Sequence, residues 1–507
     1  MASPSDAPLL RLGPDVSLTC EQLDRAARTV GPRLAPTEAA TTALARARRA
    51  LDEIRNRGDP VYGVTTGFGP LHEYPAAADA DEAHGDGLLA HLATGSGDWV
   101  APPLVRALMA ARLQSLAQGQ SALRPSTFRA VADVLAADLV PAVPSIGSVG
   151  ASGDLTPLAH VARACTGDGA VLDEDGAPVP AGPALSRAGL APVSLDARDA
   201  LALVNGTDFM TAAAALALAR ARRLLRRAEA LTGWAYRLLG CSLAPLDARL
   251  HEARGHDGQR DSAAAIRAEA TRNGPAERDE RPLQEVYSLR TAPQILGAVR
   301  DQCAYCRSVV ETELNGVTDN PVIDPDAPDA LHGGNFQGQQ VAFAADALNE
   351  AVTQIGVLAE RQIDLLLSPD QTDGAPPLLA WTPGPSSGLA GAQLTATALV
   401  AELRQHAQMA GTASVPTNGD NQDVVSMGAM AARTAYEQTD RLAPLLAVLG
   451  MALAQLTHLR DAGRADGPAP DPPDWMPPFE PVTEDRPLRD DIDRLATRWL
   501  APTDAEA

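Results

Sequence analysis

GSVGASGDLTPLAH, residues 147–160, is the stretch of this chain that says most about its fold and its chemistry. At its centre stand Ala151, Ser152 and Gly153, three small residues that can form a ring from backbone atoms alone. If the amide nitrogen of Gly153 attacks the carbonyl carbon of Ala151, loss of water gives a five-membered imidazolone. Loss of the Ser152 hydroxyl as a second water then leaves an exocyclic methylidene, which is an electrophile.

Small neighbours make this ring closure feasible, and they also fit a simpler interpretation. Gly147 and Gly150 let the backbone fold tightly where a Cβ would clash. The same run fits an ordinary glycine-rich turn before a helix, with Ser152 or Asp154 as the cap or with backbone amides binding an anion. The tripeptide alone favours the ordinary turn, because small residues cluster in turns everywhere.

The complete absence of lysine narrows the chemistry that this chain can perform. All 42 basic residues among its 507 are arginines. A pyridoxal-phosphate enzyme needs a Schiff-base lysine, a P-loop nucleotide site needs its phosphate lysine, and aldolase-type amine catalysis needs one as well. These classes are excluded, so amino-acid chemistry on this chain requires another electron sink.

The run at 147–160 resembles the prosthetic-group segment of the aromatic amino acid ammonia-lyases. That family contains the histidine, phenylalanine and tyrosine ammonia-lyases and the related aminomutases. Further motifs follow in family order over nearly the whole chain: YGVTTGFG near residue 62, LVNGT, YSLRTAPQ, TDNPV, LHGGNFQGQ, LAERQI and NQDVVSMG near residue 421. The resemblance implies that Ala151-Ser152-Gly153 becomes 4-methylideneimidazole-5-one (MIO), with no external cofactor and no metal.

Helical periodicity dominates the chain and predicts a mainly α fold with long packed helices. The segments are about 36–57, 101–138, 208–240, 291–315, 338–367, 389–411 and 424–460. Extended structure is expected only in short stretches such as 170–179. Together with the resemblance, this predicts a long-helix bundle core in residues 201–507 and a smaller MIO-bearing region with the catalytic tyrosine loop in residues 1–200.

Irregular segments are expected at about 62–87 and 252–284, and both are candidate lids because long loops without secondary structure are usually functional. A proline-rich connector at 467–481 precedes a last amphipathic helix that starts near Pro487. The arginine series between residues 220 and 227 is typical of a solvated or ion-paired helix face.

Composition limits the partners and the compartment. The formal charge of −22 argues against nucleic acid and anionic membranes, which attract concentrated positive charge. The apolar runs near 208–219 and 442–456 are too short or too interrupted to span a bilayer. Five cysteines and the lack of a secretory pattern predict the cytoplasm. Cys303 and Cys306, a lone CxxC, are interpreted as helix residues.

Tyr62 matches the family's catalytic tyrosine, which removes the β-proton of the substrate. A phenol that acts as a base must be partly ionised, and lowering its pKa from about 10 to 7 requires about 4 kcal/mol of preferential stabilisation of the phenolate. Backbone amides, a helix amino-terminus or a cation are expected to supply it. Without the family context, Tyr62 would be interpreted as a tyrosine packed in a glycine turn.

Tyr287 and Arg290 lie in YSLR, where their spacing places them on one face of a helical turn. Arginine suits a substrate carboxylate because its planar fork donates two parallel charge-assisted hydrogen bonds. Tyr287 matches a second family tyrosine that hydrogen-bonds near the MIO or assists proton transfer.

Four more residues are assigned by the resemblance. Asn205 in LVNGT matches an asparagine near the prosthetic group, and Asn335 in GGNFQG matches one near the substrate carboxylate. Phe336 is expected to pack against the imidazolone segment. Gln422 stands where histidine-acting members carry glutamate, and this departure weighs against histidine as the substrate. Without the resemblance, either asparagine would fit a turn or cap.

His91-Leu92 is expected to select the substrate. The matching pair tends to be His-Leu in tyrosine enzymes, Phe-Leu in phenylalanine enzymes and Ser-His in histidine enzymes. An imidazole can exchange a hydrogen bond with a para-hydroxyl, and a buried His91 without that partner would lose about 1–3 kcal/mol. Leu155 is expected to line the same aromatic pocket. A lone histidine of this kind is otherwise more often a satisfied core residue.

The resemblance therefore implies conversion of L-tyrosine to trans-p-coumarate and ammonia by a homotetramer whose sites draw on several subunits. A tyrosine aminomutase making β-tyrosine is the nearest alternative, because TNGDNQDVVSMG departs from the form common in the lyases. Mixed phenylalanine and tyrosine activity also stays open. A silent scaffold would be expected to lack Ser152, Tyr62 or Arg290, and all three are present. The fumarase-aspartase type carries a lysine in its signature loop, which this chain lacks.

Overall fold

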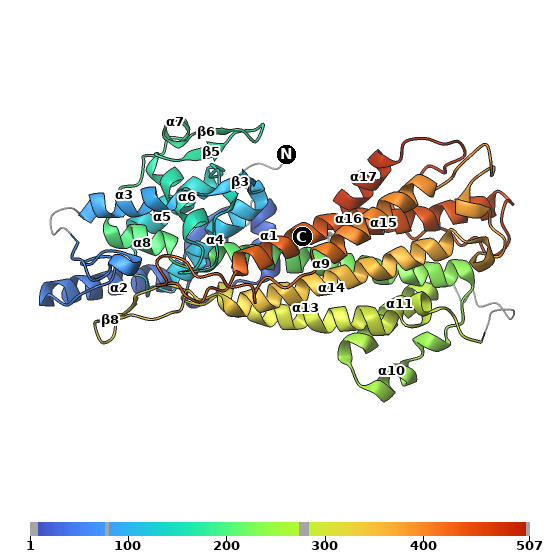
Figure 1. Ribbon diagram of the computed structural model, residues 1–507, viewed down its shortest axis with the longest axis horizontal. Coiled ribbons are helices and arrows are strands. Elements are labelled where there is room, and N and C mark those ends of the chain that lie inside the picture. The colour runs from blue at the N-terminus through green and yellow to red at the C-terminus, as the bar shows by residue number, and fades with distance from the viewer. Residues whose placement is uncertain (1–8, 77–80, 273–282, 503–507) are drawn as a thin grey trace. The chain divides into compact units, whose positions relative to one another are not determined.

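The computed structural model describes residues 9–76, 81–272 and 283–502, and it is mainly helical, as predicted (Figure 1). The chain divides into two compact units, each assembled from three segments. The first unit comprises Met1–Leu216, Arg307–Asp346 and Met409–Arg433, and the second comprises Ala217–Cys306, Ala347–Gln408 and Thr434–Ala507. The predicted division into residues 1–200 and 201–507 remains a prediction.

The first unit contains shorter helices and the described strands, which occur in pairs. Its helices are α1 Cys20–Arg28, α2 Glu38–Arg57, α3 Asp81–Leu92, α4 Pro102–Ala117, α5 Pro125–Ala136, α6 Leu155–Thr166, α7 Ala181–Arg187 and α8 Ala197–Val204, with a 3₁₀ turn η2 at Gly69–Leu71. The parallel pair is β1 Leu10–Leu12 with β2 Leu34–Pro36. The antiparallel pairs are β3 Ser96–Trp99 with β4 Pro144–Ile146, β5 Ala170–Leu172 with β6 Pro178–Pro180, and β7 Val322–Asp324 with β8 Asp329–Leu331.

Local sequence explains the ends of the helices near the site. Thr37 caps α2 by accepting a hydrogen bond from the amide of Ala40, and Gly58 ends α2 in the left-handed conformation that glycine adopts at low cost. One face of α2 packs into a cluster that also holds Val61, Val64, Ile323 and Ala330. The tyrosine segment at residue 62 and the β7–β8 hairpin therefore rest on the same helix.

The second unit is built from long helices and smaller ones around them. Its elements are α10 Ala248–Arg254, α11 Asp257–Ala270, α12 Tyr287–Arg290, α15 Ala390–Gln405 and α17 Arg489–Leu500, with 3₁₀ turns η3 Ala244–Leu246, η4 Pro369–Gln371 and η5 Pro377–Leu379. Four further helices contribute residues to both units: α9 Asp208–Leu239, α13 Ala292–Leu314, α14 Gln339–Leu366 and α16 Gly428–Asp461.

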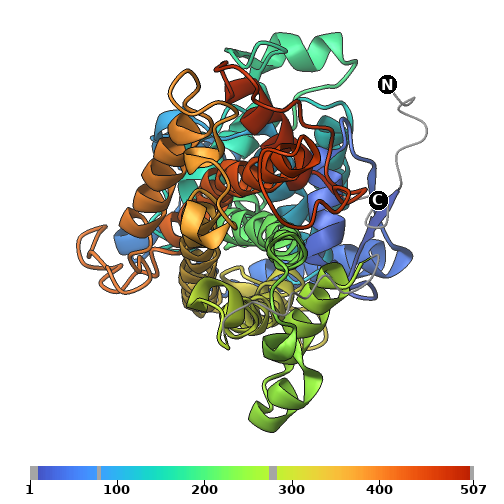
Figure 2. The same cartoon turned by 90° about the vertical axis from the view of Figure 1, so that its right-hand side faces the viewer.

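Helix α9 is the core helix of the second unit. Figure 2, a view along the long helices, shows α9 in green between the red α16 and the yellow α13 and α14. Its Thr232 hydroxyl donates to Gln362 of α14 at 3.3 Å, and Arg220 donates to Tyr436 of α16 at 2.5 Å. Most of this helix is buried, which explains its alanine- and leucine-rich composition, and Arg226 is exposed.

Helix α16 continues through Pro444, in agreement with the helix expected at about 424–460. Within the described residues it is the one helix long and apolar enough to cross a membrane by length and composition. Its most apolar window is 89% buried by the protein itself, which is the environment of a core helix.

Two predicted segments differ from the structure. The expected helix at 101–138 is two helices, because the chain turns at Gly119 and Ala122, both with positive φ, and Pro125 then starts α5. The expected irregular segment at 252–284 is largely helical, since α11 covers Asp257–Ala270, while residues 273–282 lie outside the described chain. Its polar composition belongs to a surface helix with one buried face.

Other expectations agree with the structure. Cys303 and Cys306 are buried in α13, and burial raises the pKa of each thiol to about 12, which keeps both unreactive. The arginines of α9 are partly ion-paired, as Arg220 is with Asp440, and partly stacked, as Arg227 is over Trp475.

Candidate functional site

A cavity of about 660 Å³ in the first unit collects most of the residues that the sequence analysis singled out. Its walls come from the tyrosine segment, from α3, from the glycine-rich run before α6, from α8 and from the segment around residue 420. Its lining includes Tyr62, Phe68, His84, His91, Leu92, Ser152, Leu155, Asn205, Asn320 and Gln422. Segments far apart in the sequence thus meet in one concave site.

The triad adopts a turn that its small side chains permit. Gly150, Ser152 and Gly153 all have positive φ, of 72°, 54° and 73°. A Cβ at residue 153 would lie 2.2 Å from the carbonyl oxygen of Gly206, so only glycine fits there. The amide of Asp154 donates to that same oxygen at 2.7 Å, which holds the two backbones together.

Side chains from distant segments fix the triad. Asn205, 3% exposed at the end of α8, donates from Nδ2 to the carbonyl oxygen of Ser152 at 2.8 Å. Gln422 Nε2 donates to Ser152 Oγ at 3.3 Å. Behind the triad, the buried Ser426 hydroxyl donates to the carbonyl of Gly150 at 3.3 Å. The Ser152 carbonyl and hydroxyl are therefore both hydrogen-bonded.

Tyr62 is half-buried and its hydroxyl oxygen accepts a hydrogen bond from the amide of Gly69 at 2.7 Å. Burial raises the pKa of Tyr62 above its usual value of 10, and the Gly69 hydrogen bond opposes this rise. The first unit alone therefore does not provide the net phenolate stabilisation expected from the sequence. The ring of Phe68 meets the Tyr62 ring edge-on at 6.5 Å.

His91 and Leu92, at the end of α3, line the cavity together with Leu155 at the start of α6. The Nδ1 of His91 lies 3.1 Å from the carbonyl oxygen of Gly87. A carbonyl can only accept, so Nδ1 carries a proton in this contact and leaves Nε2 of a neutral ring as an acceptor. His91 is exposed in the single chain and not buried as expected, so water competes for Nε2.

Asp154, directly after the triad, is a fully buried carboxyl group. Its Oδ1 accepts from the Ser148 hydroxyl at 2.7 Å and its Oδ2 from the Met210 amide at 2.9 Å. Burial raises the pKa of Asp154 to about 7, and the nearby Asp208 adds to the rise, while both hydrogen bonds oppose it. The residue directly after the triad is thus a buried carboxyl group whose pKa lies near neutrality.

The remaining predicted site residues lie elsewhere. Tyr287 and Arg290 form α12 in the second unit, and the Arg290 guanidinium lies over the Tyr287 ring at 4.6 Å, so the two share a helical face as expected. Asn335 and Phe336 belong to the first unit but do not line the cavity. Asn335 is exposed and donates to the carbonyl of Val317 at 3.2 Å.

The lining residues that the sequence analysis did not assign to the site include Asn320, Phe68 and His84. Asn320 lies in TDNPV, which was noted only as a family motif, and it lines the cavity. Phe68 lies in YGVTTGFG, and its ring stacks on His84 of α3 with centroids 4.4 Å apart. An aromatic residue six positions after Tyr62 was the available signal for Phe68, whereas nothing in the sequence around His84 indicated its contact.

The described residues contain no group of three or more histidine, cysteine or acidic side chains that could hold a metal ion. The polar side chains that line the cavity carry hydroxyl, amide and imidazole groups, and they surround the triad itself.

Comparison with known proteins gives a consistent family match. Residues 18–471 match the model of the aromatic amino acid lyases. The chain is 44% identical to a tyrosine ammonia-lyase of Cereibacter sphaeroides, over 87% of this chain and 88% of that protein. It is 41% identical to a histidine ammonia-lyase of Burkholderia mallei, over 89% of each.

The third relative is an aminomutase. The chain is 40% identical to the MIO-dependent tyrosine 2,3-aminomutase of Streptomyces globisporus, over 90% of this chain and 87% of that protein. A crystal structure of tyrosine aminomutase from this organism aligns with a TM-score of 0.88 at 35% identity, covering 97% of both chains. The mainly α fold expected from the sequence is therefore confirmed.

Replacing Asp154 with asparagine is expected to change how stability depends on pH. The folded-state pKa of about 7 lies above the unfolded value of about 4, so between these pH values the folded chain binds a proton that the unfolded chain has released. Stability from this group is thus lost as pH rises to about 7. Relative to Asp154→Asn, the wild-type chain should lose about 2–3 kcal/mol of unfolding free energy between pH 5 and pH 8.

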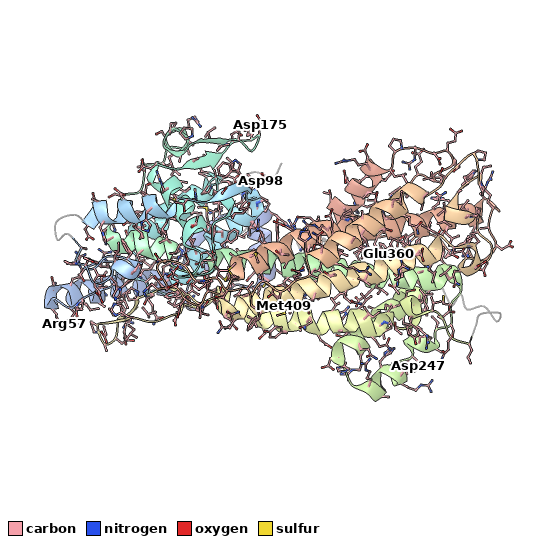
Figure 3. All side chains as sticks on the ribbon, in the orientation of Figure 1. Arg57, Asp98, Asp175, Asp247, Glu360 and Met409 are labelled. Carbon is pink, nitrogen blue, oxygen red and sulfur yellow. The ribbon has the colours of Figure 1, made fainter. Side chains whose placement is uncertain are left out.

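Thermal and chemical unfolding at the two pH values measure this difference. Asp98→Asn, at an exposed aspartate of β3 labelled in Figure 3, serves as the matched control and should show none. Parallel pH curves for the wild-type chain and Asp154→Asn would contradict the neutral form of this carboxyl in the fold.

Proposed function

Because the chain belongs to the aromatic amino acid lyase family, we propose that it eliminates ammonia from L-tyrosine to give trans-p-coumarate. One observation carries this proposal: Ser152, Tyr62 and His91 line a single cavity of the first unit. An electrophile, a base and a partner for a phenol are the three groups that this reaction needs on an aromatic amino acid. The tyrosine preference rests on His91-Leu92.

The residues at 151–153 fit an MIO group. The tight turn and the glycine that Gly206 requires suit attack of the Gly153 nitrogen on the Ala151 carbonyl carbon. The Ser152 carbonyl oxygen, which cyclisation retains, already accepts the hydrogen bond from Asn205. Once cyclised, these residues supply an electrophilic methylidene carbon, which a serine hydroxyl is not. Asn205 would hold the cyclised group through this carbonyl oxygen, whereas the hydrogen bond from Gln422 is to the Ser152 hydroxyl, which leaves as water.

The protein's own side chains then bind and orient the substrate. The phenol of L-tyrosine donates to His91 Nε2, the nitrogen left free by the contact of Nδ1 with Gly87. Leu92 and Leu155 pack against the substrate ring. This arrangement directs the amino group and the β-carbon toward Ser152 and Tyr62, and phenylalanine leaves the His91 acceptor unpaired.

Tyr62 removes the β-proton while the electrons of that C–H bond form the double bond and the C–N bond breaks. The raised pKa of Tyr62 in the first unit means that a further cation or donor has to favour the phenolate. We propose that assembly of the subunits supplies this cation or donor. Arg290, whose buried Nε has no hydrogen-bond partner within the described part of the chain, would bind the substrate carboxylate in a homotetramer whose sites draw on several subunits, with Tyr287 beside it.

The aminomutase reaction is the second candidate, and one structural feature favours it. Asn418, Gly419 and Asp420 all have positive φ, of 56°, 62° and 61°, and form a left-handed turn closed by Thr417 and Gln422. Asn418 lines the cavity. A cavity wall that retains the acrylate and ammonia would permit readdition at the β-carbon. Mixed activity on phenylalanine remains a further possibility within the same site.

The remaining elements of the proposal concern the cell and the partners. A net charge of −22 fits a protein whose partner is a small amino acid and not nucleic acid or an anionic membrane surface. We place the enzyme in the cytoplasm as a homotetramer. Size-exclusion chromatography with light scattering tests the assembly.

The decisive experiment supplies the purified chain with tyrosine, phenylalanine and histidine in separate reactions. Aryl acrylate absorbance and free ammonia from tyrosine support the lyase, while β-tyrosine identifies the aminomutase. Turnover of histidine alone would contradict the proposal.

The substitution Ser152→Ala is expected to abolish elimination while leaving the helical fold in place. Alanine retains the turn but has no hydroxyl to lose, so no methylidene forms. Turnover and intact mass are measured together, and the wild-type chain should show a deficit of two waters that the variant lacks. Undiminished turnover in Ser152→Ala would refute covalent catalysis at this residue.

The substitution His91→Phe is expected to move the preference from tyrosine toward phenylalanine. Loss of one hydrogen bond in an exposed position is worth about 0.5–1.5 kcal/mol, so the tyrosine-to-phenylalanine ratio of kcat/KM should fall about 2-fold to 10-fold. His72→Phe, at an exposed histidine outside the cavity lining, is the control and should leave the ratio unchanged. An unaltered ratio in His91→Phe removes His91 as the selector.

A further inference from the structure

We propose that His332 is the positioning residue of Tyr62: its imidazole holds the backbone of the catalytic tyrosine at a fixed place beside the triad. This inference rests on the proposed function, because it assigns His332 to the same reaction. His332 does not line the cavity, so its effect is exerted through Tyr62 and not on the substrate.

The contact itself defines the state of His332. The amide nitrogen of Tyr62 donates to His332 Nε2 at 3.1 Å. A backbone amide can only donate, so Nε2 accepts and the ring is neutral, with its proton on Nδ1. Two hydrogen bonds thus hold Tyr62. Its backbone amide donates to His332, and its hydroxyl oxygen accepts from the amide of Gly69.

The hairpin before His332 is anchored to the helix that also supports Tyr62. Ile323 and Ala330 of the β7–β8 hairpin pack in the same cluster as Val61 and Val64, against α2. Arg57 at the end of α2, labelled in Figure 3, donates to the carbonyl of Pro328 at 2.7 Å. The segments that carry the donor and the acceptor of the Tyr62–His332 hydrogen bond are therefore both packed against α2.

A chain of hydrogen bonds connects the segment that carries His332 to the triad. The amide of Gly333, next to His332, donates to Asn320 Oδ1 at 2.8 Å. The amide of Asn320 donates to Asn205 Oδ1 at 2.6 Å, and Asn205 Nδ2 donates to the Ser152 carbonyl at 2.8 Å. The Asn205 side chain thus uses both ends of its amide, and Asn320 donates from its backbone nitrogen and accepts at Oδ1. The segment that holds the base is therefore connected to the electrophile.

The Tyr62–His332 hydrogen bond fixes the position of Tyr62 and contributes little to folding stability. His332 is exposed, and an exposed hydrogen bond adds little to folding because water replaces it. A displacement of about 1 Å at a reacting group, in contrast, can cost about 100-fold in rate. Loss of the His332 acceptor should accordingly lower kcat and leave thermal stability nearly unchanged.

Two variants separate the acceptor from the ring. His332→Phe keeps a planar ring without an acceptor, and His332→Gln places an amide oxygen about where Nε2 stands. We expect His332→Phe to lower kcat about 10-fold to 100-fold with KM within about 3-fold, and His332→Gln to recover most of the loss. His256→Phe, at an exposed histidine before α11 in the second unit, is the matched control.

Two further measurements make the result independent of turnover. Hydrogen exchange of the peptide that contains Tyr62 should accelerate in His332→Phe and return toward wild type in His332→Gln. The intact mass should show the two-water deficit in both variants, since the triad is not altered. Equal kcat in all three chains, equal losses in both variants, a change confined to KM, or unchanged exchange at Tyr62 would each overturn the assignment. An inactive wild-type chain with the expected exchange pattern would instead overturn the proposed function.

Discussion

The close approach of two glycine backbones, Gly153 and Gly206, is the constraint on which the site depends. No side chain fits between them, and the amide of Asp154 donates across the contact to Gly206. This approach sets the turn of the triad and brings Asn205, the neighbour of Gly206, within reach of the Ser152 carbonyl. The cavity is therefore organised by a backbone contact, and its functional side chains are arranged around that contact.

Electrostatics in the first unit are consistent with this organisation. In this unit, buried Arg112 forms an ion pair with Asp208, and buried Arg198 forms one with Asp319. Burial lowers the pKa of Arg198 and raises that of Asp208, so each group depends on its partner to remain charged. Removing one partner of such a pair leaves an uncompensated charge, which penalises alternative arrangements of α4, α8 and the start of α9.

Periodicity and motifs predicted the fold well, and the site in part. The long helices followed from apolar spacing, because amphipathic and buried helices carry that signal directly in the sequence. Tyr62, His91, Leu155, Asn205 and Gln422 were each placed from motifs and do line the cavity. Asn320 was not named, because an asparagine in a proline-containing turn gives no sign of the direction it faces, and only the folded chain shows that it lines the cavity. The role of Asn335 stays a prediction. The exposure of His91 and the direction of the Tyr62 pKa shift depend on what surrounds them, and no local pattern reports that.

The contacts of the triad also impose an order on biosynthesis. Ser426, whose hydroxyl is hydrogen-bonded to Gly150, lies 276 residues further along the chain, and Gln422 lies 270 residues beyond Ser152. A ribosome that has just released residues 151–153 has not yet made either partner. The hydrogen bonds that these two residues give to Gly150 and the triad can form only after both have been synthesised, so a shorter nascent chain holds the triad through Gly206 and Asn205 alone.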